Sequence, residues 1–176
     1  MDVLKVITST AFLFSIIRVT TPLLYGSLSS LMSELSGVSN IGIEGMMLTC
    51  ALTGVLSSAF FGGNAWIGLL VAMLVGTGLG LLMCFLITKL KTDAIITGIA
   101  YNLTASGLTV FLLYLAVGEK GISSSLVSGV LPSVKIPLID KIPVLGAIIS
   151  GHNILTYVAV LLVIAISIFL YKTPLG

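Results

Sequence analysis

Glu44 is the ionisable residue whose position in the sequence suggests chemistry most directly. It stands in residues 36–47, Ser-Gly-Val-Ser-Asn-Ile-Gly-Ile-Glu-Gly-Met-Met, where a polar stretch passes into a long apolar run. A carboxylate at such a depth is costly unless it is paired or hydrated, which makes it a candidate for contact with a solute or a partner subunit. The alternative is structural, because the positive end of a helix dipole stabilises a carboxylate in the first turn.

A second set of polar residues lies within residues 94–117, which we predict to be helical. Spacing of three or four residues arranges them in two stripes, Thr97, Tyr101 and Thr104 on one and Asn102, Ser106 and Thr109 on the other. They should face other helices or a water-filled path, since contact with lipid is costly. Hydrogen bonding between helices and the lining of a solute path both remain possible interpretations of these residues. The candidates for a solute pathway are therefore Asn40, Glu44, Thr97, Tyr101, Asn102 and Ser106.

The sequence offers no pattern typical of an enzyme. His152 is the one histidine, and no cysteine, histidine or carboxylate stands near it at metal-ligand spacing. No glycine-rich segment ends in Lys-Ser or Lys-Thr to hold a nucleotide phosphate. We therefore expect no catalytic residue, no metal and no cofactor, and we expect His152 to flank a helix at the membrane boundary.

Composition places the chain in a lipid bilayer. Residues 45–88 contain no Asp, Glu, Lys, Arg or His, the mean hydropathy is +1.25 and only 8% of residues are charged. A span needs roughly 20 apolar residues, so this run can cross, turn at residues 62–64 and cross back. The basic residues form no cluster that could follow a phosphate backbone, which excludes nucleic acid as a partner.

Charged and turn residues divide the chain into about five predicted spans, and the fold class is an all-α, polytopic bundle of transmembrane helices. The first span contains Arg18 and Pro22, so it is either one kinked span or an interfacial piece followed by a short span. The predicted spans are residues 6–32, 42–61, 65–88, 94–117 and 153–171.

Residues 118–151 are the one extended stretch of soluble character, with a short strand-like piece predicted at residues 134–136. Lys89 and Lys91 mark the turn between the third and fourth spans as cytoplasmic. Counting spans from that turn places residues 118–151 outside the cell and Lys172 inside.

Two further patterns favour packing over chemistry. Cys50 and Cys84 both fall in apolar runs, where free cysteines are usually small buried hydrophobic residues rather than disulfide partners or metal ligands. Gly76 and Gly80 have the small-x-x-x-small spacing of a seam between membrane helices.

Residues 36–47 resemble the signature of permease subunits of ABC importers for nucleosides and simple sugars, which are relatives of the branched-chain amino-acid and ribose permeases. In the same order along the chain, residues 18–24, 97–109, 142–146 and 172–176 are similar to that family's first span, fourth span, external loop and the end of its next helix. Permeases of this family usually have about twice as many spans. The resemblance thus implies an N-terminal fragment, a truncated reading frame or a split subunit. In each case residues 1–176 would form one transmembrane permease domain.

The resemblance also implies a function. The chain would form the membrane path of an ATP-driven importer, in the cytoplasmic membrane of a bacterium, with a nucleoside favoured over a simple sugar as solute. Its implied partners are a separate ATPase subunit, a second permease subunit of the same or a homologous chain, and an extracytoplasmic solute-binding protein. The alternatives are an ion-coupled secondary transporter or channel, or an inactive membrane fragment of a permease.

Overall fold

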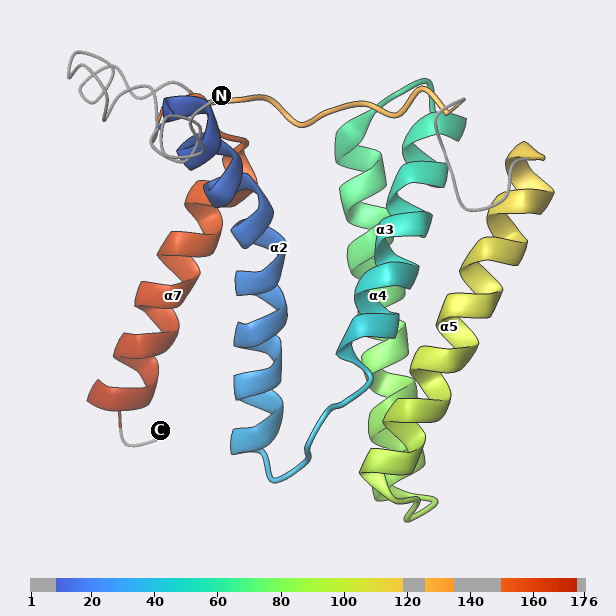
Figure 1. Cartoon of the computed structure of the whole chain (residues 1–176). Coiled ribbons are helices and arrows are strands. Elements are labelled where there is room, and N and C mark those ends of the chain that lie inside the picture. The colour runs from blue at the N-terminus through green and yellow to red at the C-terminus, as the bar shows by residue number, and fades with distance from the viewer. Residues whose placement is uncertain (1–8, 119–125, 135–149, 174–176) are drawn as a thin grey trace. The chain divides into compact units, whose positions relative to one another are not determined.

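The computed structural model describes residues 9–118, 126–134 and 150–173 (Figure 1). Within residues 9–118 and 150–173 most of the chain is helical, whereas residues 126–134 are extended. Each helix is long and apolar enough to cross a membrane. The helices are α2 (Thr10–Leu35), α3 (Ile43–Phe60), α4 (Ala65–Thr88), α5 (Ala94–Val117) and α7 (Ile154–Lys172). The predicted all-α membrane fold is confirmed, and the bounds predicted for the third and fourth spans coincide with α4 and α5.

The helix boundaries follow from residues that satisfy the backbone groups at each end. The side chain of Asn64 accepts a hydrogen bond from the backbone N–H of Trp66, and Asp93 accepts from two N–H groups in the first turn of α5. Gly118 ends α5 in a left-handed conformation, with φ at 79°. Polar and glycine caps of this kind explain why the turns between spans could be located in the sequence.

The first predicted span is one helix. Pro22 lies inside α2, which continues to Leu35. The alternative of an interfacial piece followed by a short span is therefore wrong. Proline removes a single backbone donor and clashes with the preceding turn, and a long apolar helix tolerates one such interruption.

By contacts, the chain divides into two compact units, Met1–Leu28 with Leu131–Gly176, and Ser29–Val130. In the first, the start of α2 packs on α7 through buried polar pairs. The hydroxyls of Thr21 and Thr156 lie 3.1 Å apart, and the Tyr25 hydroxyl donates to the Leu155 carbonyl at 2.8 Å. Such hydrogen bonds between helices suit a lipid environment, where water offers no alternative partner.

His152 also belongs to the first unit and directly precedes the residue that caps α7. It is 3% exposed and stacks on the ring of Phe14, with centroids 3.9 Å apart. The sequence places it correctly beside a helix. The strand-like prediction falls largely outside the described residues, but Ser133 does pair with Asn153 in an isolated antiparallel bridge.

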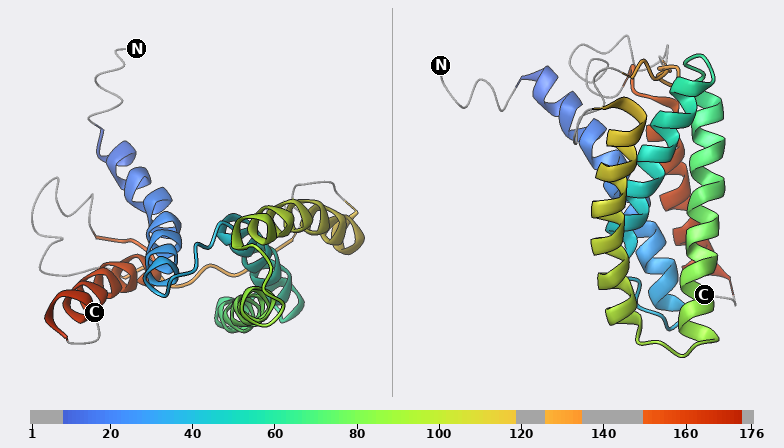
Figure 2. Two further views of the ribbon diagram at one scale, coloured as in Figure 1. Left: turned by 90° about the horizontal axis from the view of Figure 1, so that it is seen from below. Right: turned by 90° about the vertical axis from the view of Figure 1, so that its right-hand side faces the viewer.

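The second unit is built on an antiparallel α3–α4 pair, seen from the end and from the side in Figure 2. A Cβ built on Gly68 would lie 2.7 Å from the Gly54 carbonyl oxygen and 3.0 Å from the Ser58 Cβ. One built on Gly76 would lie 3.0 Å from the Cys50 sulfur. Small residues at every fourth position on both helices therefore let the two backbones approach closely.

The seam differs from the predicted one by one turn. Gly76 contributes to it, but a Cβ on Gly80 would meet nothing within 4 Å, so Gly80 does not. The cysteines differ too: Cys50 is half-buried in the seam as expected, whereas Cys84 is exposed. Periodicity alone showed that α4 had a small-residue stripe, but not where along it the partner helix ended its contact.

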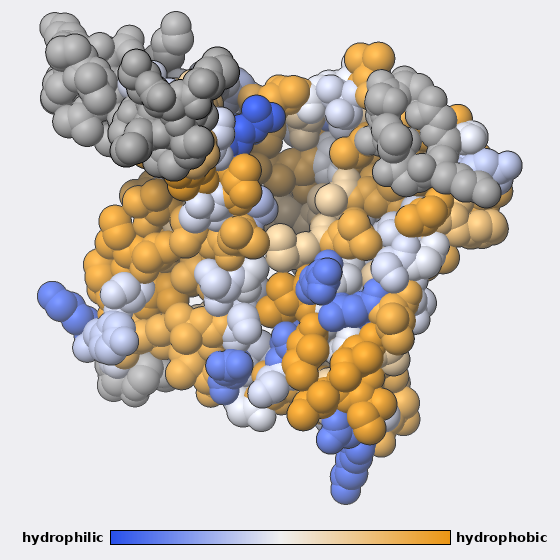
Figure 3. All heavy atoms as spheres, viewed as in Figure 1, coloured by the Kyte–Doolittle hydropathy of each residue, from blue (hydrophilic) through white to orange (hydrophobic). Residues whose placement is uncertain are grey.

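Large apolar side chains cover the outer surfaces of the helices, as the orange regions of Figure 3 show. Leu74, Ile96 and Leu103 are each at least 70% exposed, and only 6% of the apolar window of α4 is buried within the protein. Exposure on this scale is incompatible with water and typical of lipid contact.

The seam yields a direct stability test. Gly68→Ala should destabilise the protein by about 1–3 kcal/mol, because the new methyl group collides with backbone of α3. Gly78→Ala, on the same helix with nothing within 4 Å of its Cβ, should be neutral or slightly stabilising. Unfolding by SDS in mixed micelles, followed by circular dichroism, measures both; equal stability of the two variants would contradict the seam.

Candidate functional site

Helix α3 begins well inside the span of its neighbours. It has 18 residues, whereas α4 and α5 have 24 each. The difference of six residues corresponds to about 9 Å of helix. Consistent with this, a Cβ on Gly42, just before α3, would lie 2.9 Å from Met83 Cε, one turn before α4 ends. Residues 36–42 are thus a non-helical segment that enters the bundle.

This segment satisfies much of its backbone by local hydrogen bonds. Gly37 has φ at 83° and donates to the Glu34 carbonyl, while the Ser33 hydroxyl donates to the Val38 carbonyl at 2.8 Å. The Asn40 carboxamide oxygen accepts from the Gly42 N–H at 3.0 Å. Non-helical backbone at membrane depth requires such partners, because lipid supplies none.

Asn102 on α5 supplies two further partners. Its Oδ1 accepts from the Gly45 N–H at 2.8 Å, and its Nδ2 donates to the Ile41 carbonyl at 2.9 Å. Gly42, the residue at the N-cap of α3, has no side chain that could do this. A side chain 57 residues further along the chain therefore caps α3.

Small residues allow α5 to come close enough for this cap. A Cβ on Gly98 would lie 2.9 Å from the Gly42 nitrogen. One on Gly45 would lie 2.9 Å from the Ala105 Cβ and 3.0 Å from a ring carbon of Tyr101. We name this contact the amide clamp: Asn102 with Gly98 and Ala105 on α5, against Gly42 at the N-cap of α3 and Gly45 in its first turn.

The structure separates the predicted pathway residues into two groups. Asn40, Glu44, Tyr101 and Asn102 come together at the start of α3. Glu44 is exposed and lies in the first turn of α3, as its structural interpretation requires.

The hydroxyl groups of Thr97 and Ser106 donate to carbonyl groups of α5 or its cap. Thr97 lies in the first turn of α5, where its hydroxyl donates to the Asp93 carbonyl at 2.7 Å. Ser106 is exposed, and its hydroxyl donates to the Leu103 carbonyl of its own helix at 2.9 Å. Both hydroxyls thus bond to backbone within α5 or its cap.

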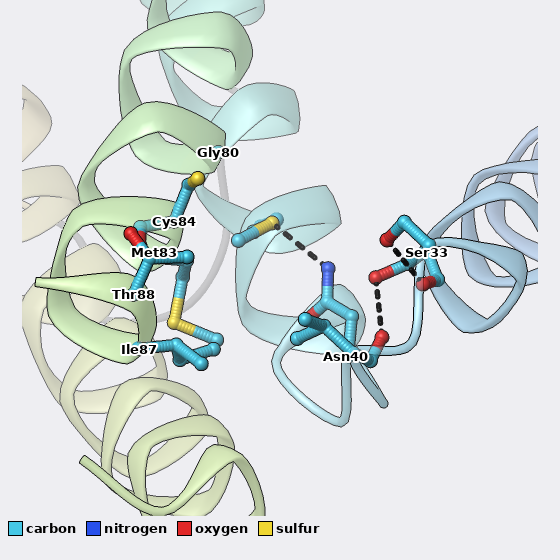
Figure 4. A pocket seen from close by; sticks show the side chains of 10 residues that line it. Ser33, Asn40, Gly80, Met83, Cys84, Ile87 and Thr88 are labelled. Atoms are coloured by element: carbon cyan, nitrogen blue, oxygen red, sulfur yellow. Dashed lines mark hydrogen bonds between the residues drawn. The ribbon is translucent and has the colours of Figure 1, made fainter. Parts of the chain in front are cut away.

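A cavity of about 140 Å³ opens between residues 33–46 and the last two turns of α4 (Figure 4). No Asp, Glu, Lys, Arg or His lines it. Its walls combine hydroxyl, amide and thioether groups with apolar side chains: Ser33, Ser36, Val38, Asn40, Met46, Gly80, Met83, Cys84, Ile87 and Thr88. The volume is below the roughly 300–1,000 Å³ of sites that enclose a whole small molecule.

The polar residues of this cavity other than Asn40 were not singled out from the sequence. Ser33, Ser36 and Thr88 lie in a connector and a helix end, where serine and threonine usually serve as caps. Gly98 was also missed as part of a site, although its spacing of four residues from Asn102 puts both on one helix face. That spacing was the available signal.

The comparisons with known proteins decide the family. Residues 12–176 match the family described as the permease component of the branched-chain amino acid transport system. The chain belongs to this permease family. It is accordingly a multi-pass protein of the cell membrane, in agreement with the five helices of the described residues that are long and apolar enough to span one. No solved structure matches the chain at a significant level.

Three curated permeases are similar to the chain. The guanosine ABC transporter permease protein NupQ of Bacillus subtilis is 36% identical, over 88% of this chain and 50% of that protein. The putative glucose ABC transporter permease protein TsgC13 of Haloferax volcanii is 32% identical, over 91% and 47%. The nucleoside ABC transporter permease protein NupC of Lactococcus lactis is 29% identical, over 99% and 55%. The chain thus spans about half the length of the curated relatives it matches.

The amide clamp can be tested by removing the Asn102 carboxamide. Asn102→Ala should lower the free energy of unfolding by about 1–3 kcal/mol for each buried backbone group left without a partner. Ser106→Ala on the same helix should change it by less than about 0.5 kcal/mol, because its exposed hydroxyl bonds only to its own helix. SDS unfolding in mixed micelles measures both, and a similar result for the two variants would refute the clamp.

Proposed function

We propose that this chain forms part of the membrane path of an ATP-binding-cassette importer that carries an uncharged polar solute, a nucleoside or a simple sugar. The observation that carries the proposal is the family match over residues 12–176. The names of the relatives restrict the class of solute that we propose. Two of the three are named for guanosine or nucleoside transport and one for glucose.

The proposal assigns the energy source and the delivery of solute to other proteins. A separate ATPase subunit hydrolyses ATP, an extracytoplasmic binding protein delivers the solute, and a second permease subunit of the same or a related chain completes the path. The turn at Lys89 and Lys91 faces the cytoplasm, since short cytoplasmic loops are enriched in basic residues. The start of α3 and the cavity then lie toward the cytoplasmic side.

Within this proposal, Asn40 and Glu44 are the residues best placed to meet solute. Glu44 is exposed in the first turn of α3, and Asn40 lines the cavity. The Tyr101 ring on α5 lies against Gly45, the residue after Glu44. Asn102 holds this region in place through both polar atoms of its carboxamide, so its contribution to transport is positional.

Deletion of the coding sequence in its native cell tests the importer directly. Uptake of radiolabelled nucleosides and sugars is compared in the parent, the deletion strain and the complemented strain. We expect uptake of at least one such solute to fall about tenfold or more, to return on complementation, and to survive a protonophore while cellular ATP is maintained. Unchanged uptake of every solute, or loss with the proton gradient alone, would contradict the proposal.

Glu44→Gln tests the proposed contact with solute or partner. It should reduce uptake about tenfold at unchanged abundance in the membrane, the change expected for one lost hydrogen bond to a charged group. Glu34→Gln is the matched control, because Glu34 is an exposed carboxylate at the end of α2. Equal uptake by the two variants would remove Glu44 from the site.

A further inference from the structure

The cavity beside residues 36–42 has features that neither the family nor the proposed function assigns. Its α4 wall runs from Gly80 to Thr88, a distance of about 12 Å along the helix axis. Its opposite wall is the non-helical segment before α3. Non-helical backbone at membrane depth occurs where it is buried in protein or lines a water-filled cavity.

The hydrogen-bond pattern of the lining favours water. The hydroxyl hydrogens of Ser33 and Thr88 are used in bonds to carbonyl groups, which leaves their oxygen lone pairs as acceptors. Among the described residues, the Asn40 Nδ2 contacts only the Met46 sulfur, at 3.9 Å, as the dashed line in Figure 4 shows. A thioether is a weak acceptor, so an amide donor and several oxygen acceptors remain for water or solute.

The lining also selects by charge. It combines these neutral polar groups with an apolar wall that includes Met83 and Ile87, and no charged side chain belongs to it. An ion would lose hydration here without gaining a counter-charge, which is costly. A neutral molecule with hydroxyl or amide groups loses little hydration free energy, because the polar groups of the lining replace its bonds to water.

We propose that this cavity is a water-filled vestibule on the cytoplasmic side of the path, through which the uncharged, hydrogen-bonding solute leaves the permease. The part that concerns solute rests on the proposed function. The part that concerns water does not. At about 140 Å³ the cavity holds several water molecules. It is too small to enclose a whole nucleoside, so passage of the solute requires the vestibule to widen.

Two native cysteines serve as probes of water access. Cys84 lines the cavity and is exposed, whereas Cys50 packs against Gly76 in the α3–α4 seam. Charged methanethiosulfonate reagents react with thiolates in water and do not enter lipid. Variants that retain only one of the two cysteines separate their reactions.

Labelling is carried out with the trimethylammonium-ethyl methanethiosulfonate in inside-out and right-side-out membrane vesicles. We expect Cys84 to react from the cytoplasmic face at least tenfold faster than Cys50. Phe85→Cys in a background without native cysteines is the lipid-facing control at the same depth, because Phe85 is 53% exposed and does not line the cavity. A Cys84 rate equal to that of this control, or reaction from the outer face only, overturns the vestibule.

Filling the cavity is the second arm of the test. A Cβ on Gly80 meets nothing within 4 Å, and Gly80 lines the cavity, so Gly80→Leu should fill the space without a collision. Gly78→Leu is the matched control, since Gly78 is equally unobstructed but lies outside the lining. We expect Gly80→Leu alone to slow Cys84 labelling at least tenfold.

The same two variants test the passage of solute. Uptake of the solute identified by the deletion experiment should fall about tenfold in Gly80→Leu and stay within twofold in Gly78→Leu. Blocked labelling with normal uptake would show that solute does not use the vestibule. Rapid Cys84 labelling in a cell where deletion changes no uptake would instead refute the importer and leave the water-filled cavity standing.

Discussion

A helix that starts within a bundle leaves its first backbone N–H groups without partners in its own turns, and α3 is such a helix. Its first internal bond runs from the Met46 N–H to the Gly42 carbonyl, so the four preceding N–H groups need other partners. Asn40 accepts a hydrogen bond from the first of these groups, the Gly42 N–H, and Asn102 accepts one from the last, the Gly45 N–H. The Asn102 Nδ2 also donates to the Ile41 carbonyl, so α5 is bonded to the connector before α3 as well as to α3 itself. Asn102 thus binds backbone groups on both sides of the point where α3 begins.

The rest of the second unit is arranged around that constraint. Glycine at positions 42, 45 and 98 brings α5 close enough for the carboxamide to reach backbone. The α3–α4 seam of small residues holds the remainder of α3 against its other neighbour. Because α3 is short, the space below its start is not filled by helix. There the connector and the end of α4 enclose a polar cavity. We propose this cavity as the path of a neutral solute, and it lies beside the residues that hold the start of α3.

Much of the fold could be predicted from the sequence, because lipid imposes simple rules. Spans are apolar runs, and Asn64 and Asp93 mark their starts through ordinary capping chemistry. The motif at residues 36–47 indicated the family before any comparison. Asn40, Glu44, Tyr101 and Asn102 are four of the six residues predicted to line a solute pathway, and the role of all six in transport stays a prediction.

What the sequence could not supply was the pairing of surfaces. Helical periodicity placed Asn102 on a stripe but could not show that its partners are backbone atoms of α3. For the same reason, the sequence analysis wrongly included Gly80 in the helix seam and wrongly predicted that Cys84 is buried. In the structure Gly80 lies outside the seam and Cys84 is exposed. Positions along one helix follow from sequence, whereas the depth at which a second helix begins depends on packing between distant segments.

The most direct measurement of the clamp is the scalar coupling across the hydrogen bond from the Gly45 amide nitrogen to the Asn102 side-chain carbonyl carbon, by NMR in detergent micelles. We expect a measurable coupling and slow exchange of the Gly45 amide proton with solvent, and we expect both to be lost in Asn102→Ala. Absence of the coupling together with rapid exchange in the unaltered protein would contradict it.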